Sequence, residues 1–327
     1  MYEFVQKLIE TKDNFILTSH VNPDGDSIGS ELALYTFLKN KGKNAKIINY
    51  SATPYNYLFL DKNNIIEKFD ENIHQKAINE AGAVFILDTN EYSRLKTMAP
   101  YIKESPAIKV CIDHHLGMEK NGFDNVISDI ESPSTGEILY KFLLSYGNNS
   151  INKDIAEYLY TAIMTDTGSF RFPRTDAETH LITANLLDLG IDPVYIYNEV
   201  YSKSSIGRLK LLSIFLRKLT LEYDNRLIYA VMLQKEFDET GTTEYDTEGF
   251  SHHMMSIETV QIALIFTEGR NGIKVSFRSK GDIYVNELAK EFGGGGHKNA
   301  AGTWLAEKDM DNVCKRVISN AKKYIIN

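Results

Sequence analysis

Carboxylate and imidazole side chains recur directly after short apolar runs in the first half of the chain. Each of these runs has the length and the β-branched content of a buried strand. A further aspartate stands in a Thr-Asp-Thr-Gly turn. The residues are His20, Asp24 and Asp26 after Phe15–Ser19, Asp88 after Ala83–Leu87, Asp113, His114 and His115 after Ile108–Ile112, and Asp166 in the turn.

A cluster of these side chains indicates a metal centre. Several carboxylates packed together cost free energy unless cations neutralise them. Mixed carboxylate and imidazole ligands favour Mn²⁺ and also suit Mg²⁺, Fe²⁺, Co²⁺ and Zn²⁺. About six ligands are too many for one ion that keeps open positions, whereas two ions ~3.5–4 Å apart that share a carboxylate account for the number.

Each residue taken alone also has a purely structural interpretation. Asp88 is a suitable helix cap, and the segment Asn22–Asp26 has the composition of a turn. The pair His114–His115 resembles many exposed histidine pairs. Because a structural interpretation does not explain why such residues follow several strands at once, we favour the metal centre.

The surrounding pattern predicts an α/β fold. The runs Phe15–Ser19, Lys46–Tyr50, Ala83–Leu87 and Ile108–Ile112 alternate with helical stretches such as 27–41. This alternation is typical of a parallel sheet covered by helices. Ligands of such sheets bind outside the carboxyl ends of the strands, where the acidic and histidine residues fall.

The length of 327 residues favours two domains. We expect a metal-binding catalytic domain over 1–190, a helical connector over 191–218 and a smaller mixed α/β substrate-binding domain over 219–327. The active site is expected in the cleft between the domains, with hinge motion of the connector around the substrate.

Composition excludes several classes of protein. A net charge of −8 without a basic tract argues against binding of long duplex nucleic acid. Neither a membrane span nor a signal-peptide core is found in the sequence. Cys111 and Cys314 lie far apart in apolar runs, which indicates free thiols and a cytoplasmic location. The sequence leaves open whether the protein forms a homodimer.

A glycine run in the second half indicates a phosphate-binding segment. Gly293, Gly294, Gly295 and Gly296 allow close backbone approach and present N–H groups to an anion, although a loop that caps a helix has the same composition. Nearby side chains supply further candidates for contact with a phosphate or sugar. They are Arg278, Ser279, His297 and Asn299, with Arg94 from the first half.

These motifs together resemble the DHH phosphoesterase superfamily. The segments His20–Asp26, Asp88, Asp113–His115 and Thr165–Gly168 look like its four motifs, in family order. The segment from Gly293 to Gly302 looks like the signature of the DHH-associated C-terminal domain. Length and the strand Ser276–Ser279 are most similar to the compact nanoRNase and pAp phosphatase group.

The resemblance implies a role for each residue. It gives His20, Asp24 and Asp88 to one metal, and Asp26, Asp88, His114 and Asp166 to the second, so that Asp88 bridges the two. Asp113 would orient His114, and His115 would face the scissile phosphate as a donor or proton carrier. The implied substrates are short single-stranded oligoribonucleotides, cleaved to mononucleotides, and 3′-phosphoadenosine 5′-phosphate (pAp), cleaved to AMP.

Other functions remain as alternatives. Cleavage of cyclic di-AMP or its linear product pApA uses the same chemistry. A catalytically silent nucleotide-binding module is the alternative from another class. An inorganic pyrophosphatase is disfavoured because its phosphate-gripping pattern is not seen, and a processive RecJ-type DNA exonuclease because the chain lacks a basic groove and room for further domains.

Overall fold

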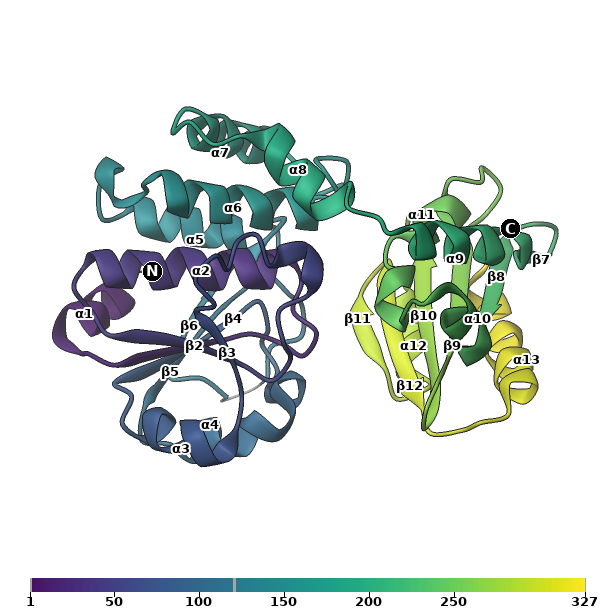
Figure 1. Cartoon of the computed structure of the whole chain (residues 1–327), viewed down its shortest axis with the longest axis horizontal. Coiled ribbons are helices and arrows are strands. Elements are labelled where there is room, and N and C mark those ends of the chain that lie inside the picture. The colour runs from purple at the N-terminus through teal and green to yellow at the C-terminus, as the bar shows by residue number, and fades with distance from the viewer. Residues whose placement is uncertain (1, 120–121, 327) are drawn as a thin grey trace. The chain divides into compact units, whose positions relative to one another are not determined.

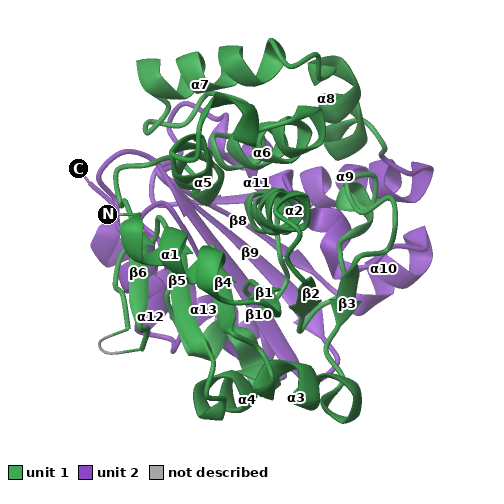
Figure 2. Ribbon diagram, turned by 90° about the vertical axis from the view of Figure 1, so that its left-hand side faces the viewer, with its two compact units in different colours: residues 1–203 green, residues 204–327 purple. Residues whose placement is uncertain are grey.

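The chain forms two compact units in a computed structural model that describes residues 2–119 and 122–326. The first unit covers residues 1–203 and the second covers 204–327 (Figure 2). The division at 203/204 falls inside the segment 191–218 that the sequence predicts as a connector. Helix α8 (Pro193–Tyr201) belongs to the first unit and helix α9 (Ile206–Arg217) to the second. The predicted role of 191–218 as a connector stays a prediction.

The first unit is built on a six-stranded parallel sheet in the order β3-β2-β1-β4-β5-β6. The expected parallel α/β architecture is therefore confirmed. Strands β3 and β6 are missing from the sequence prediction because both are short edge strands without a run of apolar residues. The strands are β1 (Phe15–Thr18), β2 (Ala45–Asn49), β3 (Ile66–Lys68), β4 (Ala83–Leu87), β5 (Ile108–Asp113) and β6 (Asn125–Ser128).

Helices cover both faces of this sheet (Figure 1). Helices α1, α2, α5 and α6 pack against one face, where the larger apolar core lies. Helices α3 and α4, with the short helix η2, cover the other face. Their bounds are α1 (Glu3–Thr11), α2 (Gly25–Asn40), η1 (Tyr55–Tyr57), α3 (Glu71–Asn79), η2 (Tyr92–Met98), α4 (Ala99–Glu104), α5 (Thr135–Leu144), η3 (Asn148–Ser150), α6 (Lys153–Asp166) and α7 (Ala177–Leu187).

Two glycines bring the covering helices close together. A Cβ atom on Gly29 of α2 would lie 2.4 Å from the Tyr158 carbonyl oxygen of α6. A Cβ atom on Gly136 of α5 would lie 2.5 Å from the Ala162 Cβ of α6. Because real side chains do not tolerate such distances, glycine is required at both positions for this packing. The close packing sets where the first turns of α2 and α5 lie.

The second unit contains a six-stranded mixed sheet in the order β11-β12-β10-β9-β8-β7. Only the β8–β9 pair is parallel. Helices α9, α10 and α11 cover one face over β8 and β9, while α12 and α13 cover the other. The elements are β7 (Thr220–Glu222), β8 (Leu227–Met232), α10 (Gln234–Thr240), η4 (Glu244–Thr247), α11 (Phe250–Met255), β9 (Ile262–Gly269), β10 (Gly272–Ser279), α12 (Val285–Lys290), β11 (Gly295–His297), β12 (Ala300–Leu305), α13 (Met310–Ala321) and η5 (Lys322–Tyr324).

The structure shows the local setting of three motifs. Asp26 lies in the first turn of α2, because Asp24 caps that helix, and not in a loop. Asp166 is the last residue of α6 and not part of the following turn. Gly295 and Gly296 belong to strand β11 and not to a flexible loop. Over the described residues, no helix is both long and apolar enough to cross a bilayer.

Candidate metal centre

The predicted metal ligands of the first unit meet at the carboxyl edge of its sheet. Strands β1 and β4 are neighbours in the sheet although β2 and β3 intervene in sequence. This is the point at which the order of a doubly wound sheet reverses and ligands bind. The ligand atoms form two groups in which all atoms lie within 4.8 Å of one another. The groups are His20, Asp24 and Asp88, and Asp26, His114 and Asp166.

The first group surrounds the imidazole of His20. Its Nε2 lies 3.3 Å from Asp88 Oδ2 and 3.8 Å from Asp24 Oδ2. The other oxygen of Asp24 accepts hydrogen bonds from the backbone N–H groups of Asp26 and Ser27 as the N-cap of α2. Capping thus fixes one oxygen of Asp24 and leaves the second oxygen directed at the group.

The second group surrounds the imidazole of His114. Its Nε2 lies 3.3 Å from Asp166 Oδ2 and 3.9 Å from Asp26 Oδ2. His114 and Asp26 are both buried, whereas the Asp166 side chain is 26% exposed. Solvent therefore reaches this group from the side of Asp166.

Asp88 lies between the two groups. Its Oδ2 faces His20, and its Oδ1 lies 3.6 Å from His114 Nε2. The backbone of Asp88 has a φ of +58°, a left-handed conformation that aspartate tolerates better than most residues. This turn directly after β4 directs one carboxylate oxygen toward each group, as a bridging ligand requires.

The hydrogen bonding of His114 fits a cation at this position. Its Nδ1 lies 3.2 Å from the Ser132 carbonyl oxygen, which only accepts, so Nδ1 carries a proton. Burial lowers the pKa of His114, which favours the neutral ring. The unprotonated Nε2 then directs its lone pair at carboxylate oxygens, which is unfavourable unless a cation lies between them. Metal-binding histidines commonly donate their other ring N–H to a carbonyl or carboxylate oxygen in this way.

His20 has the same arrangement. Its Nδ1 lies 2.9 Å from the Val21 carbonyl oxygen and therefore donates to it. The single proton of the Ser27 hydroxyl goes to Asp88 Oδ2 at 2.6 Å, although the same hydroxyl lies 2.9 Å from His20 Nε2. The Nε2 atom thus faces acceptors on several sides, and a cation satisfies all of them.

The electrostatics of the carboxylates also indicate that positive charge belongs here. Burial and the neighbouring carboxylates raise the pKa of Asp26 well above its ordinary value, and the same causes raise the pKa of Asp166. Burial alone would raise the pKa of Asp88 as well, but its contact with the His20 imidazole and the other imidazoles around it hold it well below its ordinary value. Bound cations would favour the ionised form of all three.

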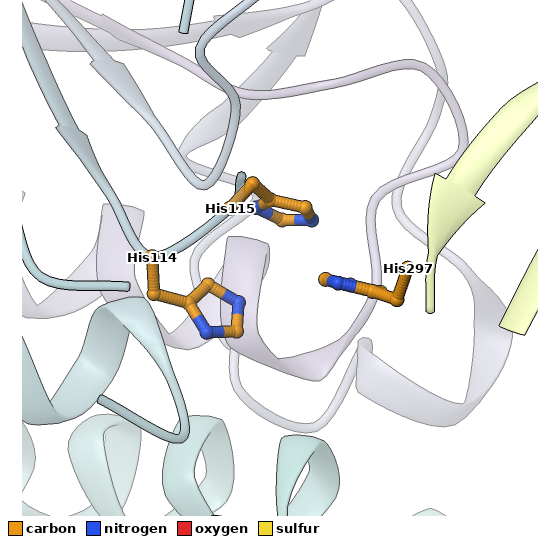
Figure 3. A group of neighbouring side chains, drawn as sticks. All are labelled: His114, His115 and His297. Carbon is orange, nitrogen blue, oxygen red and sulfur yellow. The ribbon is translucent and has the colours of Figure 1, made fainter. Parts of the chain in front are cut away.

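His115 is held by Asp113, which corrects one detail of the sequence interpretation. Asp113 was expected to orient His114, but its Oδ1 lies 2.7 Å from Nδ1 of His115, and its Oδ2 accepts the His115 backbone N–H. Residues two apart in an extended segment share a side, whereas adjacent residues point to opposite sides. His114 and His115 directly follow β5 in the chain, and both are drawn in Figure 3. Their ring planes lie at 73° to each other.

The environment of His115 suits a proton donor. Burial alone would lower its pKa, but the hydrogen bond to Asp113 and the charge of Asp88 raise it above its ordinary value. Nη1 of Arg94 lies 3.5 Å from His115 Nε2. This places Arg94 beside the cluster, and its contact with a phosphate stays a prediction.

The N-terminus of α5 holds Asp26 in place, which sequence reasoning missed. The backbone N–H of Thr135 donates to Asp26 Oδ2 at 2.7 Å, and that of Gly136 donates to Oδ1 at 2.8 Å. The Thr135 hydroxyl also donates to Asp88 Oδ1 at 3.2 Å. The capping-box spacing of Ser134 and Glu137 predicts this helix start, but not that its free N–H groups point at an aspartate from another helix.

Glu31 is a further buried group that the sequence did not single out. It lies in α2, and its Oε2 accepts a hydrogen bond from Asn49 Nδ2 at 2.8 Å. Asn49 Oδ1 in turn accepts the backbone N–H of Ser19, next to His20. Burial raises the pKa of Glu31 to about 8 against the opposing effect of Asn49. This pKa favours the protonated form of Glu31 at neutral pH, and its hydrogen bond to Asn49 braces β1 and β2 behind the candidate metal centre.

The Glu31→Gln variant should gain stability over the wild type as the pH rises. An unfolded glutamate has a pKa of about 4.5, so between that value and about 8 the folded wild type holds a proton that the unfolded chain has lost. The free energy of unfolding of the wild type then falls by about 1.4 kcal/mol for each unit that the pH rises. The Glu31→Gln variant does not show this loss, because glutamine does not titrate. Denaturant unfolding of metal-free protein at pH 5, 6, 7 and 8 measures the difference.

The exposed Glu80→Gln variant is the matched control, and its stability relative to the wild type should not change with pH. A constant difference between Glu31→Gln and the wild type from pH 5 to 8 would show that Glu31 is ionised in the folded protein.

The candidate substrate residues of the second unit divide into two sets. Arg278 and His297 lie on the same face of the sheet, because both align with Ala300 of β12 in the strand register. By contrast, Asn299 Nδ2 donates to Ser279 Oγ at 2.9 Å and to two backbone carbonyls, so both residues close the turn after β10. Contact of any of these residues with substrate stays a prediction.

The glycine run also has a structural function. The N–H of Gly293 donates to the Lys290 carbonyl and that of Gly294 to the Ala289 carbonyl, which ends helix α12. These two N–H groups are used within the chain. Gly295 and Gly296 are exposed and pair with β12, so only an N–H group that this pairing leaves unused is able to donate to an anion.

The fold and the paired carboxylate–imidazole groups define the class of two-domain α/β proteins with a candidate dinuclear metal centre at a sheet edge. Two family models match the chain, the DHH family N-terminal domain over residues 14–163 and the DHHA1 domain over 224–323. The chain belongs to the DHH family, as the sequence resemblance predicted.

Similar proteins cover the whole chain. An exopolyphosphatase-related protein of Bacteroides fragilis has a solved structure with 33% identity and a TM-score of 0.93, and the match covers 99% of this chain and 96% of that one. The bifunctional oligoribonuclease and PAP phosphatase NrnA of Thermus thermophilus is 28% identical over 94% of this chain and 89% of its own length. The cyclic-di-AMP phosphodiesterase PdeA of Listeria monocytogenes is 25% identical over 98% of this chain and 49% of its own length.

Proposed function

We propose that this protein is a metal-dependent phosphoesterase that releases mononucleotides from very short RNA and AMP from pAp. The observation that carries the proposal is the position of Asp88, which directs one oxygen toward His20 and the other toward His114. Such a pair of sites suits phosphate-ester hydrolysis. The choice of substrates rests on the similarity to an oligoribonuclease and PAP phosphatase.

The donor set suits two divalent ions, with Mn²⁺ preferred. Every proposed ligand is a carboxylate oxygen or an imidazole nitrogen, which fits Mn²⁺ better than a thiolate-preferring metal; Mg²⁺, Co²⁺, Fe²⁺ and Zn²⁺ are alternatives. His20, Asp24 and Asp88 would hold one ion, and Asp26, Asp88, His114 and Asp166 the other. When bound, the ions would act as Lewis acids toward the phosphate and lower the pKa of water.

The residues around the cluster have separate tasks in this proposal. His115 holds a proton at Nε2 or Nδ1 with support from Asp113, and we assign it to donation toward the scissile phosphate. Arg94 adds a positive charge beside His115 that attracts a phosphate oxygen. Arg278, His297 and the β11 glycines would bind the rest of the nucleotide.

The location and partners belong to the same proposal. Cys111 and Cys314 are both free and buried, which fits a reducing compartment such as the cytoplasm. A ligand of one to a few nucleotides needs only the local basic residues above, so long duplex nucleic acid is not a proposed partner.

The test is a substrate panel with purified protein and added Mn²⁺. The panel contains 5′-labelled RNA of two to five nucleotides, pAp, pApA, cyclic di-AMP and a long RNA. We expect mononucleotides from the short RNA and AMP from pAp, with activity that declines as the RNA lengthens. Preferred turnover of cyclic di-AMP or pApA would favour the activity named for the Listeria relative. If no substrate gives a product when metal is supplied, the alternative of a catalytically silent nucleotide-binding module would be favoured.

A further inference from the structure

One face of the second unit's sheet carries a row of residues with the chemistry to bind a nucleotide chain. In β10 and β12, Lys274 is directly opposite Trp304, and Arg278 is opposite Ala300. Directly opposed residues of antiparallel strands share a face, and β11 extends the same face. We call these eight residues the β10–β12 strip: Lys274, Ser276, Arg278, Gly295, His297, Ala300, Gly302 and Trp304.

The two ends of the strip are chemically distinct. Arg278 lies at one end, near His297 in the register, and Lys274 with Trp304 lies at the other. Arg278 lies four positions after Lys274 along β10, which corresponds to about 13 Å. The positions between them carry only small residues. A ligand that contacts Arg278 can therefore run along the strand toward Trp304 without meeting a large side chain of the strip.

Trp304 offers an open aromatic surface. It is the single tryptophan of the chain, and it is 50% exposed. Part of its ring packs over the β9–β10 hairpin, where a Cβ atom on Gly269 would lie 2.4 Å from the ring and one on Gly272 would lie 3.0 Å from it. The hairpin glycines hold the ring in place, and its exposed part is available to stack on a nucleobase.

The charges of the strip favour an anion. The ammonium group of Lys274 and the guanidinium group of Arg278 form no ion pair with any described residue. The one hydrogen bond of the Arg278 side chain goes to the neighbouring Phe277 carbonyl. The strip contains no acidic residue, although the whole chain has a net charge of −8. The charge of Glu248 acts on Arg278, but neither Arg278 nor Lys274 forms an ion pair with a described residue, so both suit contact with phosphate groups.

We infer that Lys274 and Trp304 form a distal subsite for a nucleotide beyond the one held at Arg278. Lys274 binds a backbone phosphate there, and Trp304 stacks on a base. The inference rests on the proposed function and specifies which substrates use the subsite. pAp has a single nucleoside and is too short to contact both ends of the strip, whereas RNA of three or more nucleotides reaches both.

Substitution of Trp304 separates this role from simple packing on the hairpin. Trp304→Leu keeps an apolar cover over Gly269 and Gly272, and Trp304→Tyr keeps an aromatic ring. We expect Trp304→Leu to raise the KM for an RNA tetranucleotide about tenfold, the lower range of one stacked base. The KM for pAp should stay within about twofold, and Trp304→Tyr should restore most of the loss. Melting temperatures of the variants verify that the fold is kept.

The salt dependence of KM tests whether Lys274 contacts a phosphate. Loss of one phosphate contact to a single strand reduces the slope of log KM against log salt concentration by about 0.7. We expect Lys274→Met to show this change with the tetranucleotide and no change with pAp. Equal effects of the Lys274 and Trp304 variants on both substrates, or no effect on either, would overturn the distal subsite.

A binding measurement keeps this inference separate from the proposed activity. The fluorescence of the single tryptophan reports on Trp304 alone. With EDTA present to prevent hydrolysis, the tetranucleotide should quench this fluorescence saturably, and pAp should quench it little. Quenching by the tetranucleotide in a protein that cleaves no substrate would support the distal subsite and contradict the proposed hydrolytic activity. Cleavage without quenching would support the activity and contradict the subsite.

Discussion

The Asp88→Asn variant should lose at least about a thousandfold in kcat on both pAp and short RNA. Asparagine keeps the size of aspartate and tolerates the left-handed backbone at this position, so the fold should be retained. It removes the negative charge and one of the two anionic oxygens that face His20 and His114. Steady-state assays with saturating Mn²⁺, together with circular dichroism, measure the effect.

Asp192→Asn is the matched control for this prediction. Asp192 caps helix α8 in the same unit, and asparagine is an equally good cap. This variant should retain wild-type activity. An Asp88→Asn protein with activity within tenfold of the wild type would contradict a bridging role of Asp88.

Added Mn²⁺ should raise the melting temperature of the metal-free protein by about 10–20 °C. At concentrations near 100 times the dissociation constant, each bound ion contributes about 2.7 kcal/mol, and two contribute about 5 kcal/mol. For a cooperative unit of roughly 200 residues, each 1 kcal/mol corresponds to about 2–4 °C. Differential scanning calorimetry with EDTA and then with excess Mn²⁺ measures the shift.

The pH dependence of this shift follows from the raised carboxylate pKa values. The folded-state pKa values of Asp26 and Asp166 lie above those of the unfolded chain, so the folded metal-free protein binds more protons. Its stability therefore falls as the pH rises above about 4 through the raised values, and bound cations oppose this loss. The stabilisation by Mn²⁺ should thus grow with pH. A shift of equal size in a His20→Ala, His114→Ala double variant would indicate binding elsewhere.

The sequence predicts the convergence of the carboxylate and imidazole side chains well because strand order and side-chain type act together. Buried parallel strands are recognisable from β-branched apolar runs, and their carboxyl ends meet at one edge. His20 and Asp88 follow such runs directly, so their proximity follows from the fold. The resemblance implies that Asp113 orients His114, but the alternation of sides along an extended segment brings the Asp113 carboxylate to His115 instead.

The supporting residues could not be predicted in the same way. Thr135 and Gly136 reach Asp26 only because α5 packs closely on α6, and Glu31 reaches Asn49 across two elements. These contacts depend on helix packing, which leaves no local sequence signal. The strip between Arg278 and Trp304 likewise depends on the register of β10 against β12.

Crystals of the protein soaked in Mn²⁺, with diffraction recorded at the manganese absorption edge, test the central claim most directly. We predict two anomalous peaks per chain, ~3.5–4 Å apart, at the carboxyl edge of the first sheet. One peak should contact His20 and the other His114, with Asp88 bound to both. A single peak, or two peaks that share no ligand, would contradict the dinuclear centre.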